Sequence, residues 1–451
     1  MIAPSRSALP RARGLVAAAQ RGELDVVTTA TRTLARLAEI DPDLRSFVAV
    51  DADAVLARAR ELDAAGPSGP LHGVPVALKD IIDTADLPTR YGSPIYADHR
   101  PSVDATVVRR LREAGALIVG KTVTTEFALF HPGPTRNPHD LSRTPGGSSS
   151  GSAAAVAAGI VPLALGTQTA GSVIRPASFC GIVGAKPTFG RVPFDGVKVC
   201  AHSLDTLGVM ALDVEDAALA LSVMTGDDLG FTTARAALTE RPLRLGWWPG
   251  ATAMDPEAAA VVAAAREHAV RRGDVEVAEV VLPAWFGELI TDQQALMRTE
   301  AYAALAAERT EHAELLSDAL RSYLEPGPDP DGAARALARR PEAQAALAAA
   351  LAGLDGLLTP SVLGEAPPLA TTGDPSLCRT WTLLGVPAVV VPGLVGPSGL
   401  PLGVQVVGPH GADGWTLAAA GRFAELIAPS PGPASHHEAL AGRREEDRAW
   451  R

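Results

Sequence analysis

The sequence predicts an α/β fold in which helices surround a large mixed, mostly parallel twisted sheet. Strand-like apolar runs alternate with helical periodicity along the 451 residues, which is typical of such sheets. Within residues 243–281, two short apolar runs flank a helical segment and indicate a β-α-β unit. The composition, with 47% hydrophobic and 20% charged residues, is sufficient for a large core.

The individual elements follow this alternation. Helices are predicted for residues 24–39, 52–62, 105–113, 153–159 and 257–272, and strands for residues 74–78, 116–119, 243–247, 275–281, 356–358, 388–391 and 403–407. Residues 285–353 are rich in Ala, Leu and charged residues and lack strand signals, so a helical insertion is predicted there. Neither an internal repeat nor a clean linker is visible. Residues 1–451 are therefore predicted to form a single domain that carries this insertion.

The charge pattern does not indicate a nucleic-acid-binding surface. The formal net charge is −11, and a stripe of Lys and Arg occurs nowhere except in a short cluster at Arg443, Arg444 and Arg448. A solvated tail is the simpler interpretation of that cluster. We therefore expect no nucleic-acid partner.

Cysteine usage and hydropathy indicate a cytoplasmic protein. Cys180, Cys200 and Cys378 are widely spaced and odd in number, so neither a disulfide framework nor a metal site is predicted. The longest apolar run, residues 153–166, contains Pro162 and is too short to cross a bilayer. An uninterrupted apolar signal segment is missing near the N-terminus. We expect no contact with a membrane, and a homo-oligomer is compatible with the sequence.

Two short motifs match known sites but lack the required context. Residues 115–122 fit the phosphate-binding pattern GxxxxGK[ST], yet a helix is predicted before the match and a buried strand within it. Lys121 is therefore interpreted as a residue at the end of a strand. Residues 147–151 fit the nucleophile elbow GxSxG, but the preceding residues read as a loop, whereas an elbow requires a strand there. A hydrolase with Ser149 as its nucleophile stays open as the weaker alternative.

Two turns rich in glycine and serine indicate a catalytic site when they are considered together. Residues 146–152 lead into an Ala-rich helix, and residues 166–172 follow it. Glycines allow the backbone to approach a ligand closely and to present consecutive N–H groups. A serine at the end of such a turn can attack a carbonyl while the N–H groups bind the oxyanion. Either turn alone is more simply explained as an ordinary loop.

A serine hydroxyl needs a base, and Lys79 is the best-placed candidate. It follows the apolar run 74–78, so its ammonium is expected to lie in a medium of low dielectric constant. Burial disfavours the charged form of a lysine and lowers its pKa. A surface pair of Lys79 and Asp80 explains this segment equally well.

Several segments, in consistent order along the chain, resemble the amidase signature family. They are residues 73–80, 145–159, 166–177, 180–188, 203–208, 358–360, 385–388 and 399–405. Ser148 and Ser172 are 24 residues apart, which is the spacing of the relay and nucleophile serines in that family. The resemblance covers nearly the whole chain and is weakest over residues 225–350.

The resemblance implies a Ser–cis-Ser–Lys triad that hydrolyses a small-molecule amide through an acyl-enzyme. Ser172 corresponds to the nucleophile, Ser148 to the relay serine in a cis peptide, and Lys79 to the base. The oxyanion hole would consist of the backbone N–H groups of four residues: Thr169, Ala170, Gly171 and Ser172. The family needs neither a metal nor an organic cofactor for this reaction.

Four residues are predicted to contact the substrate: Gly147, Ser149, Tyr91 and Trp381. For the two aromatic residues, ordinary core packing is the competing interpretation. Three residues depart from the family pattern, because Ser150 and Ala170 stand where glycine is usual and Gln168 where Asp is common. A backbone N–H group does not depend on its own side chain, so the oxyanion hole is expected to persist.

Two other functions are compatible with the same segments. One is a glutaminase-type A subunit of a tRNA-dependent amidotransferase, which shares the signature. The departures at Gln168 and Ala170, and at Trp381 where Asn is frequent, favour a stand-alone amidase instead. The other is a non-catalytic binding protein on the same scaffold, which the presence of all three triad positions disfavours.

Overall fold

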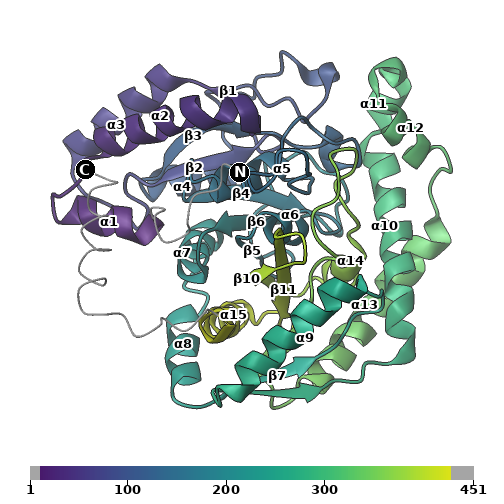
Figure 1. Ribbon diagram of the computed structural model, residues 1–451. Helices are drawn as coiled ribbons and strands as arrows, with labels where there is room; N and C mark the ends of the chain where they lie inside the picture. Colours follow the sequence, from purple (N-terminus) through teal and green to yellow (C-terminus); the bar gives the residue numbers. More distant parts are fainter. Residues whose placement is uncertain (1–10, 428–451) are drawn as a thin grey trace.

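The computed structural model describes residues 11–427, so the basic cluster at residues 443–448 lies outside the described residues. An eleven-stranded sheet surrounded by helices confirms the predicted α/β fold (Figure 1). In order across the sheet, the strands are β1 (Phe47–Val50), β3 (Leu117–Thr122), β2 (Pro75–Lys79), β4 (Leu163–Gln168), β6 (Thr206–Ala211), β5 (Val183–Lys186), β10 (Ala388–Val395), β11 (Pro401–Val407), β9 (Gly356–Pro360), β7 (Leu243–Trp247) and β8 (Val275–Glu279).

Fifteen α-helices are found in residues 11–427: α1 (Ala12–Gln20), α2 (Val26–Leu44), α3 (Ala52–Ala65), α4 (Thr106–Glu113), α5 (Ser150–Ala157), α6 (Ile174–Phe179), α7 (Val214–Thr225), α8 (Phe231–Thr239), α9 (Pro256–Arg271), α10 (Leu289–Ala304), α11 (Ala306–Glu311), α12 (Asp318–Leu324), α13 (Pro330–Ala350), α14 (Ser376–Leu383) and α15 (Asp413–Ile427). Several begin where a side-chain oxygen accepts from a backbone N–H of the first turn, as Asp25 does for α2 and Asp51 for α3. Within the described range, no helix combines the length and the apolar character needed to cross a membrane.

The sheet is mixed, as predicted, but the expectation that it is mostly parallel is wrong. Among the strands of residues 11–427, four neighbouring pairs are parallel and six are antiparallel. Helical connections join strands that point the same way, except for α3, which connects β1 to the oppositely directed β2. In two places, however, a third strand lies between them: β6 runs antiparallel between β4 and β5, and β11 runs antiparallel between β9 and β10. The alternation of strands and helices predicts the direction of connected strands but not their neighbours.

The topology collects three strand ends at one edge of the sheet. β2 is parallel to β3 on one side and to β4 on the other, so their carboxyl ends lie together. β6 begins at the same edge because it runs antiparallel to β4, with Gln168 opposite Thr206. Lys79 at the end of β2 and Asp205 just before β6 are therefore brought to the end of β4.

Residues 243–353 were predicted to contain a β-α-β unit followed by a helical insertion, and the structure tests only the first of these predictions. β7, α9 and β8 form a β-α-β unit with parallel strands, which confirms that prediction. The segment expected to be a helical insertion contains α10 to α13, and α10 packs against α13 and α14 along one side of the molecule (Figure 1). The interpretation of these helices as an insertion into a single domain stays a prediction.

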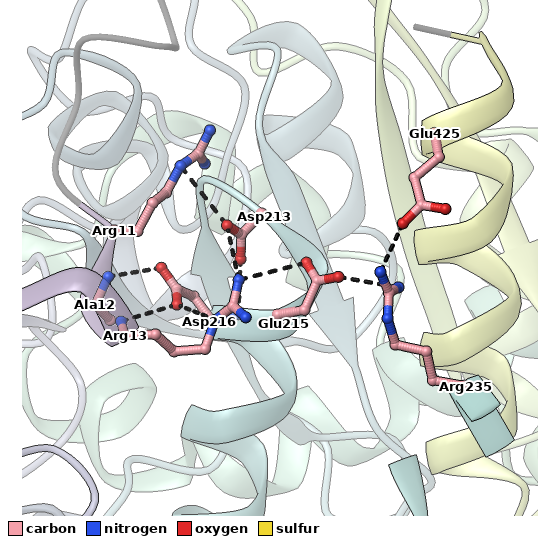
Figure 2. Close-up of polar contacts among 8 residues, drawn as sticks. All are labelled: Arg11, Ala12, Arg13, Asp213, Glu215, Asp216, Arg235 and Glu425. Atoms are coloured by element: carbon pink, nitrogen blue, oxygen red, sulfur yellow. Dashed lines mark hydrogen bonds and ion pairs between the residues drawn. The ribbon is translucent and has the colours of Figure 1, made fainter. Parts of the chain in front are cut away.

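A buried carboxylate fastens the N-terminal helix to the rest of the protein (Figure 2). Asp216 of α7 accepts hydrogen bonds from the backbone N–H groups of Ala12 at 2.6 Å and Arg13 at 3.1 Å, and from Nε of Arg13 at 3.0 Å. These backbone N–H groups lie at the start of α1, where a helix leaves its donors without internal partners. A second link in Figure 2 joins α8 to two other helices, because Arg235 pairs with two carboxylates: Glu215 and Glu425.

We expect Asp216→Ala to lower the free energy of unfolding by about 2 kcal/mol, because buried donors lose their acceptor. Urea or thermal denaturation followed by circular dichroism measures the change. Asp318→Ala is the matched control, since the Asp318 side chain is 93% exposed and pairs with Arg321 at the surface. Equal stability losses in the two variants would contradict the role of Asp216.

Candidate active site

Lys79 ends β2 inside the protein and contacts two hydroxyl groups. Its side chain is fully buried, and Nζ donates to Oγ of Ser148 at 2.6 Å and to Oγ1 of Thr167 at 2.8 Å. The alternative of a surface Lys79–Asp80 pair is therefore wrong. Thr167 lies on β4 and was not identified from the sequence.

The pKa of Lys79 is lowered from its ordinary value of 10.5 to about 7. Burial is the main cause, because a charged ammonium loses its hydration there. The negative charge of Asp205 acts in the opposite direction. A substantial fraction of Lys79 is consequently neutral near neutral pH, and a neutral amine can accept a proton.

Asp205 orders the backbone next to Lys79, and the sequence interpretation assigned it no role. Its carboxylate accepts from Oγ1 of Thr169 at 2.6 Å and from the backbone N–H groups of Cys200 at 2.7 Å and Ala201 at 2.9 Å. Burial raises the pKa of Asp205 to about 6 in spite of these hydrogen bonds. Because the carboxylate bonds to these groups, it does not pair directly with the ammonium of Lys79.

The first glycine–serine turn contains a cis peptide bond between Gly147 and Ser148, as the resemblance implies. The backbone carbonyls of Gly147 and Ser148 both accept hydrogen bonds. Nη2 of Arg175 donates to the carbonyl of Gly147 at 2.7 Å, and the backbone N–H of Thr125 donates to that of Ser148 at 3.2 Å. A side chain at Gly147 has no room, since its Cβ would lie 2.8 Å from Cγ2 of Thr372.

Ser149 is bonded to the backbone rather than presented at the end of a strand. Its Oγ donates to the carbonyl of Thr167 at 3.3 Å and accepts from the N–H of the same residue at 3.2 Å. Helix α5 begins at Ser150, and the segment that leads into Ser148 is a loop. The elbow geometry is therefore missing here.

The second turn, residues 169–172, connects β4 to α6 and is bonded from several sides. Oε1 of Gln168 accepts from the N–H groups of Val173 at 2.9 Å and Ile174 at 3.0 Å, while its Nε2 donates to Thr382 at 2.9 Å. Thr382 in turn donates to the carbonyl of Ala170 at 2.7 Å. Gln168 therefore orders the turn, whose hydrogen bonding the sequence had left open.

Ser172 stands at the end of this turn, and its residue is only 7% exposed. Arg175, three positions later in α6, reaches back to the carbonyl of Gly147, so the two serine-bearing turns lie next to each other. Gly146 confirms this proximity, since a Cβ there would lie 2.7 Å from Cα of Pro176. Arg175 belongs to one of the segments that carried the family resemblance, but no role was assigned to it.

The two aromatic residues predicted to contact substrate are packed against other aromatic residues. Tyr91 donates from its hydroxyl to Asp83 at 3.1 Å, and its ring centroid lies 4.8 Å from that of Tyr96. Trp381 is buried in α14, with its ring centroid 5.4 Å from that of Trp248. Contact of Tyr91 and Trp381 with substrate stays a prediction.

Other candidate chemistries are not supported by residues 11–427. In this part of the chain, no group of three or more His, Cys, Asp and Glu side chains is arranged to hold a metal ion. The stretch that matches the phosphate-binding pattern is the fully buried strand β3 rather than an open loop. Lys121 on this strand donates to Thr89 at 2.6 Å and to the carbonyl of Ile82.

The sequence profile of one known family, described as Amidase, matches residues 28–417. The chain belongs to the amidase family. Crystal structures in this family have similar folds: one described as an amidase has a TM-score of 0.84 at 31% identity and covers 93% of this chain and all of its own. Peptide amidase from Stenotrophomonas maltophilia has a TM-score of 0.79 at 31% identity, covering 93% of this chain and 98% of its own.

Curated relatives of this amidase are named as the A subunit of glutamyl-tRNA(Gln) amidotransferase. That of Symbiobacterium thermophilum is 49% identical over 239 residues, which are 51% of this chain and 49% of the relative. The chain therefore spans about half the length of this relative. That of Syntrophobacter fumaroxidans is 35% identical over 462 residues, with 90% of this chain and 95% of the relative covered.

We expect the stability of the amidase to depend on pH through Lys79. Between pH 7 and about 10, unfolded Lys79 is protonated while folded Lys79 is largely neutral, so the unfolded state binds more protons and stability rises with pH. Lys79→Met removes this dependence while keeping an apolar chain of similar length. The advantage of Lys79→Met over the wild type should therefore be largest at or below pH 7 and shrink towards pH 10. Urea denaturation at a series of pH values tests this, and parallel curves for the two proteins would contradict it.

Proposed function

We propose that this amidase hydrolyses a carboxamide through a serine acyl-enzyme, with Ser172 as nucleophile, Ser148 as relay and Lys79 as base. The observation that carries the proposal is the buried Lys79, which is bonded to Ser148 at 2.6 Å and has its pKa lowered to about 7. A base is most effective when its pKa lies near the working pH. The adjacency of the two serine turns supports the roles of both serines.

The reaction begins with attack of Oγ of Ser172 on the amide carbonyl carbon. The proton of Ser172 passes to Oγ of Ser148 while the proton of Ser148 passes to neutral Lys79, which becomes an ammonium. As the tetrahedral intermediate collapses, Lys79 returns a proton through Ser148 to the leaving nitrogen and the C–N bond breaks. Water then attacks the acyl-enzyme with the same relay as its base, which releases the acid.

Negative charge on the substrate oxygen is stabilised by the backbone N–H groups of residues 169–172. Such donors are effective only when they are held in position before the charge develops. Three side chains support this function because they bond to the turn or its flanks: Gln168, Thr382 and Asp205 through Thr169. The departures at Gln168 and Ala170 are therefore compatible with an oxyanion hole.

The composition and the charge of the chain support a proposal about the wider setting of the enzyme. A cytoplasmic single-domain enzyme, acting on a small amide without a metal, nucleic acid or membrane partner, fits the composition and charge. The relatives named as components of an amidotransferase favour assembly with partner proteins as an alternative.

We expect Ser172→Ala to lower kcat by at least about 10⁴-fold on any amide that the wild type hydrolyses, since it removes the attacking atom. Lys79→Ala should have an effect of similar size, because members of one relay act together. A fluorophosphonate probe followed by peptide mapping should label Ser172 in the wild type and no residue in Ser172→Ala.

Ser149→Ala is the matched control, as it removes a hydroxyl from the neighbouring turn. It should still be labelled at Ser172, because Ser149 bonds to backbone rather than to the relay. Labelling at Ser149 in the wild type, or substantial turnover by Ser172→Ala, would contradict the assignment.

The names of the curated relatives favour one second candidate, the glutaminase component of an amidotransferase. If the protein has this function, purified enzyme should release ammonia from glutamine in a coupled glutamate dehydrogenase assay, and partner proteins should co-purify with it. Hydrolysis of other amides without any release from glutamine would favour the stand-alone amidase.

A further inference from the structure

One face of α14 lies against the second serine turn. A Cβ on Gly171 would be 3.1 Å from Cβ of both Pro375 and Cys378, and Thr382 donates to the carbonyl of Ala170. Positions 375, 378, 379 and 382 have the spacing of one helical face. Arg379 therefore lies on the side of α14 that faces the turn.

Arg379 is a buried cation, and most of its N–H donors have no hydrogen-bond acceptor among the described residues. Its residue is 6% exposed, and Nη1 contacts Oε1 of Gln293 and Sδ of Met297. Within residues 11–427, no carboxylate forms an ion pair with Arg379, and its Nε and Nη2 have no hydrogen-bond partner. Neither nitrogen belongs to the buried polar atoms that are sealed off without a partner, so both remain accessible. An unpaired buried guanidinium is normally satisfied by an anion.

Gln293 connects this guanidinium to the proposed oxyanion hole. Its Nε2 donates to the carbonyl of Thr169 at 2.8 Å, while its Oε1 accepts from Arg379. The side chain of Gln293 therefore links a group bound to Arg379 with Thr169, the first residue of the turn that ends in Ser172.

A second unsatisfied group belongs to the same region. The hydroxyl of Tyr323, on α12, is buried and has no hydrogen-bond partner within the described range. Burial raises the pKa of Tyr323, and the charge of Arg379 partly offsets the effect, so the two groups are within electrostatic range of each other. The hydroxyl is closed off in this structure, so it would have to turn towards a ligand of Arg379 in order to act as an additional donor.

A second buried arginine lies near Arg379, while one exposed carboxylate, that of Asp374, acts on both cations from a distance without an ion pair. Arg175, bonded to the first serine turn, is also buried, and no ion pair to a carboxylate is found for it within the described range. The charges of Arg175 and Arg379 act on each other, since Arg379 contributes to lowering the pKa of Arg175 to about 10. Burial is the larger cause of that decrease. Two buried cations next to the serine turns favour a ligand that brings negative charge.

We propose that Arg379 and Tyr323 bind a carboxylate carried by the substrate, so that the preferred substrates are amides with a free carboxylate. This inference rests on the proposed function, because it assigns a substrate class to the same site. Arg379 would donate two parallel N–H groups to the carboxylate, and Tyr323 would donate its hydroxyl to one of the carboxylate oxygens.

Binding is measured by calorimetry in the Ser172→Ala background, which prevents turnover. The probes are the monoamides of malonic, succinic, glutaric and adipic acids, each compared with the neutral amide of the same length. For at least one length, we expect the charged monoamide to bind at least about tenfold more tightly. Adding Arg379→Gln should lower this preference by at least about tenfold, and adding Tyr323→Phe by about threefold.

Arg271→Gln is the matched control, since Arg271 is an exposed arginine on α9 and its loss removes the same charge. It should leave the preference unchanged. If Arg379→Gln fails to fold, as judged by circular dichroism, Tyr323→Phe decides the question. Equal affinity for charged and neutral amides at every length, or a preference that persists in the folded variants, would overturn the proposal.

Fluorophosphonate labelling separates this inference from the proposed function. A wild-type protein that is labelled at Ser172 but shows no carboxylate preference keeps the function and loses the substrate class. A protein that shows an Arg379-dependent preference without labelling at Ser172 keeps the anion site and loses the proposed nucleophile.

Discussion

The burial of Lys79 is the constraint on which the rest of the site depends. An ammonium at the end of a central strand would ordinarily be held charged by a carboxylate. Here its two partners are hydroxyl groups, and the carboxylate of Asp205 bonds instead to Thr169 and to backbone N–H groups. Because the carboxylate of Asp205 lies nearby but does not form an ion pair with the ammonium, the pKa of Lys79 stays near 7. The parallel pairing of β2 with β4, and the antiparallel start of β6, bring these groups to one edge of the sheet.

Distant parts of the chain hold the two serine turns together. Arg175 connects the first turn to the carbonyl of Gly373, and Thr382 reaches the second turn from α14. Gln168 illustrates why a departure from the family pattern need not disturb the site. Its amide oxygen accepts hydrogen bonds from two backbone N–H groups, and its amide nitrogen donates one to Thr382. An ionised Asp at this position could only accept hydrogen bonds. Gln168 and Thr382 are thus suited to each other, 214 positions apart.

The sequence predicted the fold class and the neighbourhood of the site better than its detailed contacts. Apolar runs and glycine-rich turns are local signals, so β2, α5 and the two serine turns were all identified. The insertion of β6 and β11 between parallel strands has no local signal, which is why the expectation of mostly parallel neighbours was wrong. For the same reason, the sequence did not single out Asp205, Arg175 and Arg379. Their contacts span 36, 28 and 86 positions, and only the folded chain brings these partners together.

Burying the charges of Arg175 and Arg379 without an ion pair costs desolvation free energy. Their shared position near the serine turns indicates a role in the site. Arg175 and Arg379 both contact the segments that flank Ser172, directly or through Gln293. A positive field at this point favours two negative charges: a carboxylate on the incoming substrate and the oxyanion that forms during attack. Substrate binding and stabilisation of the oxyanion would then depend on the same pair of buried cations, so altering one of them should affect both steps.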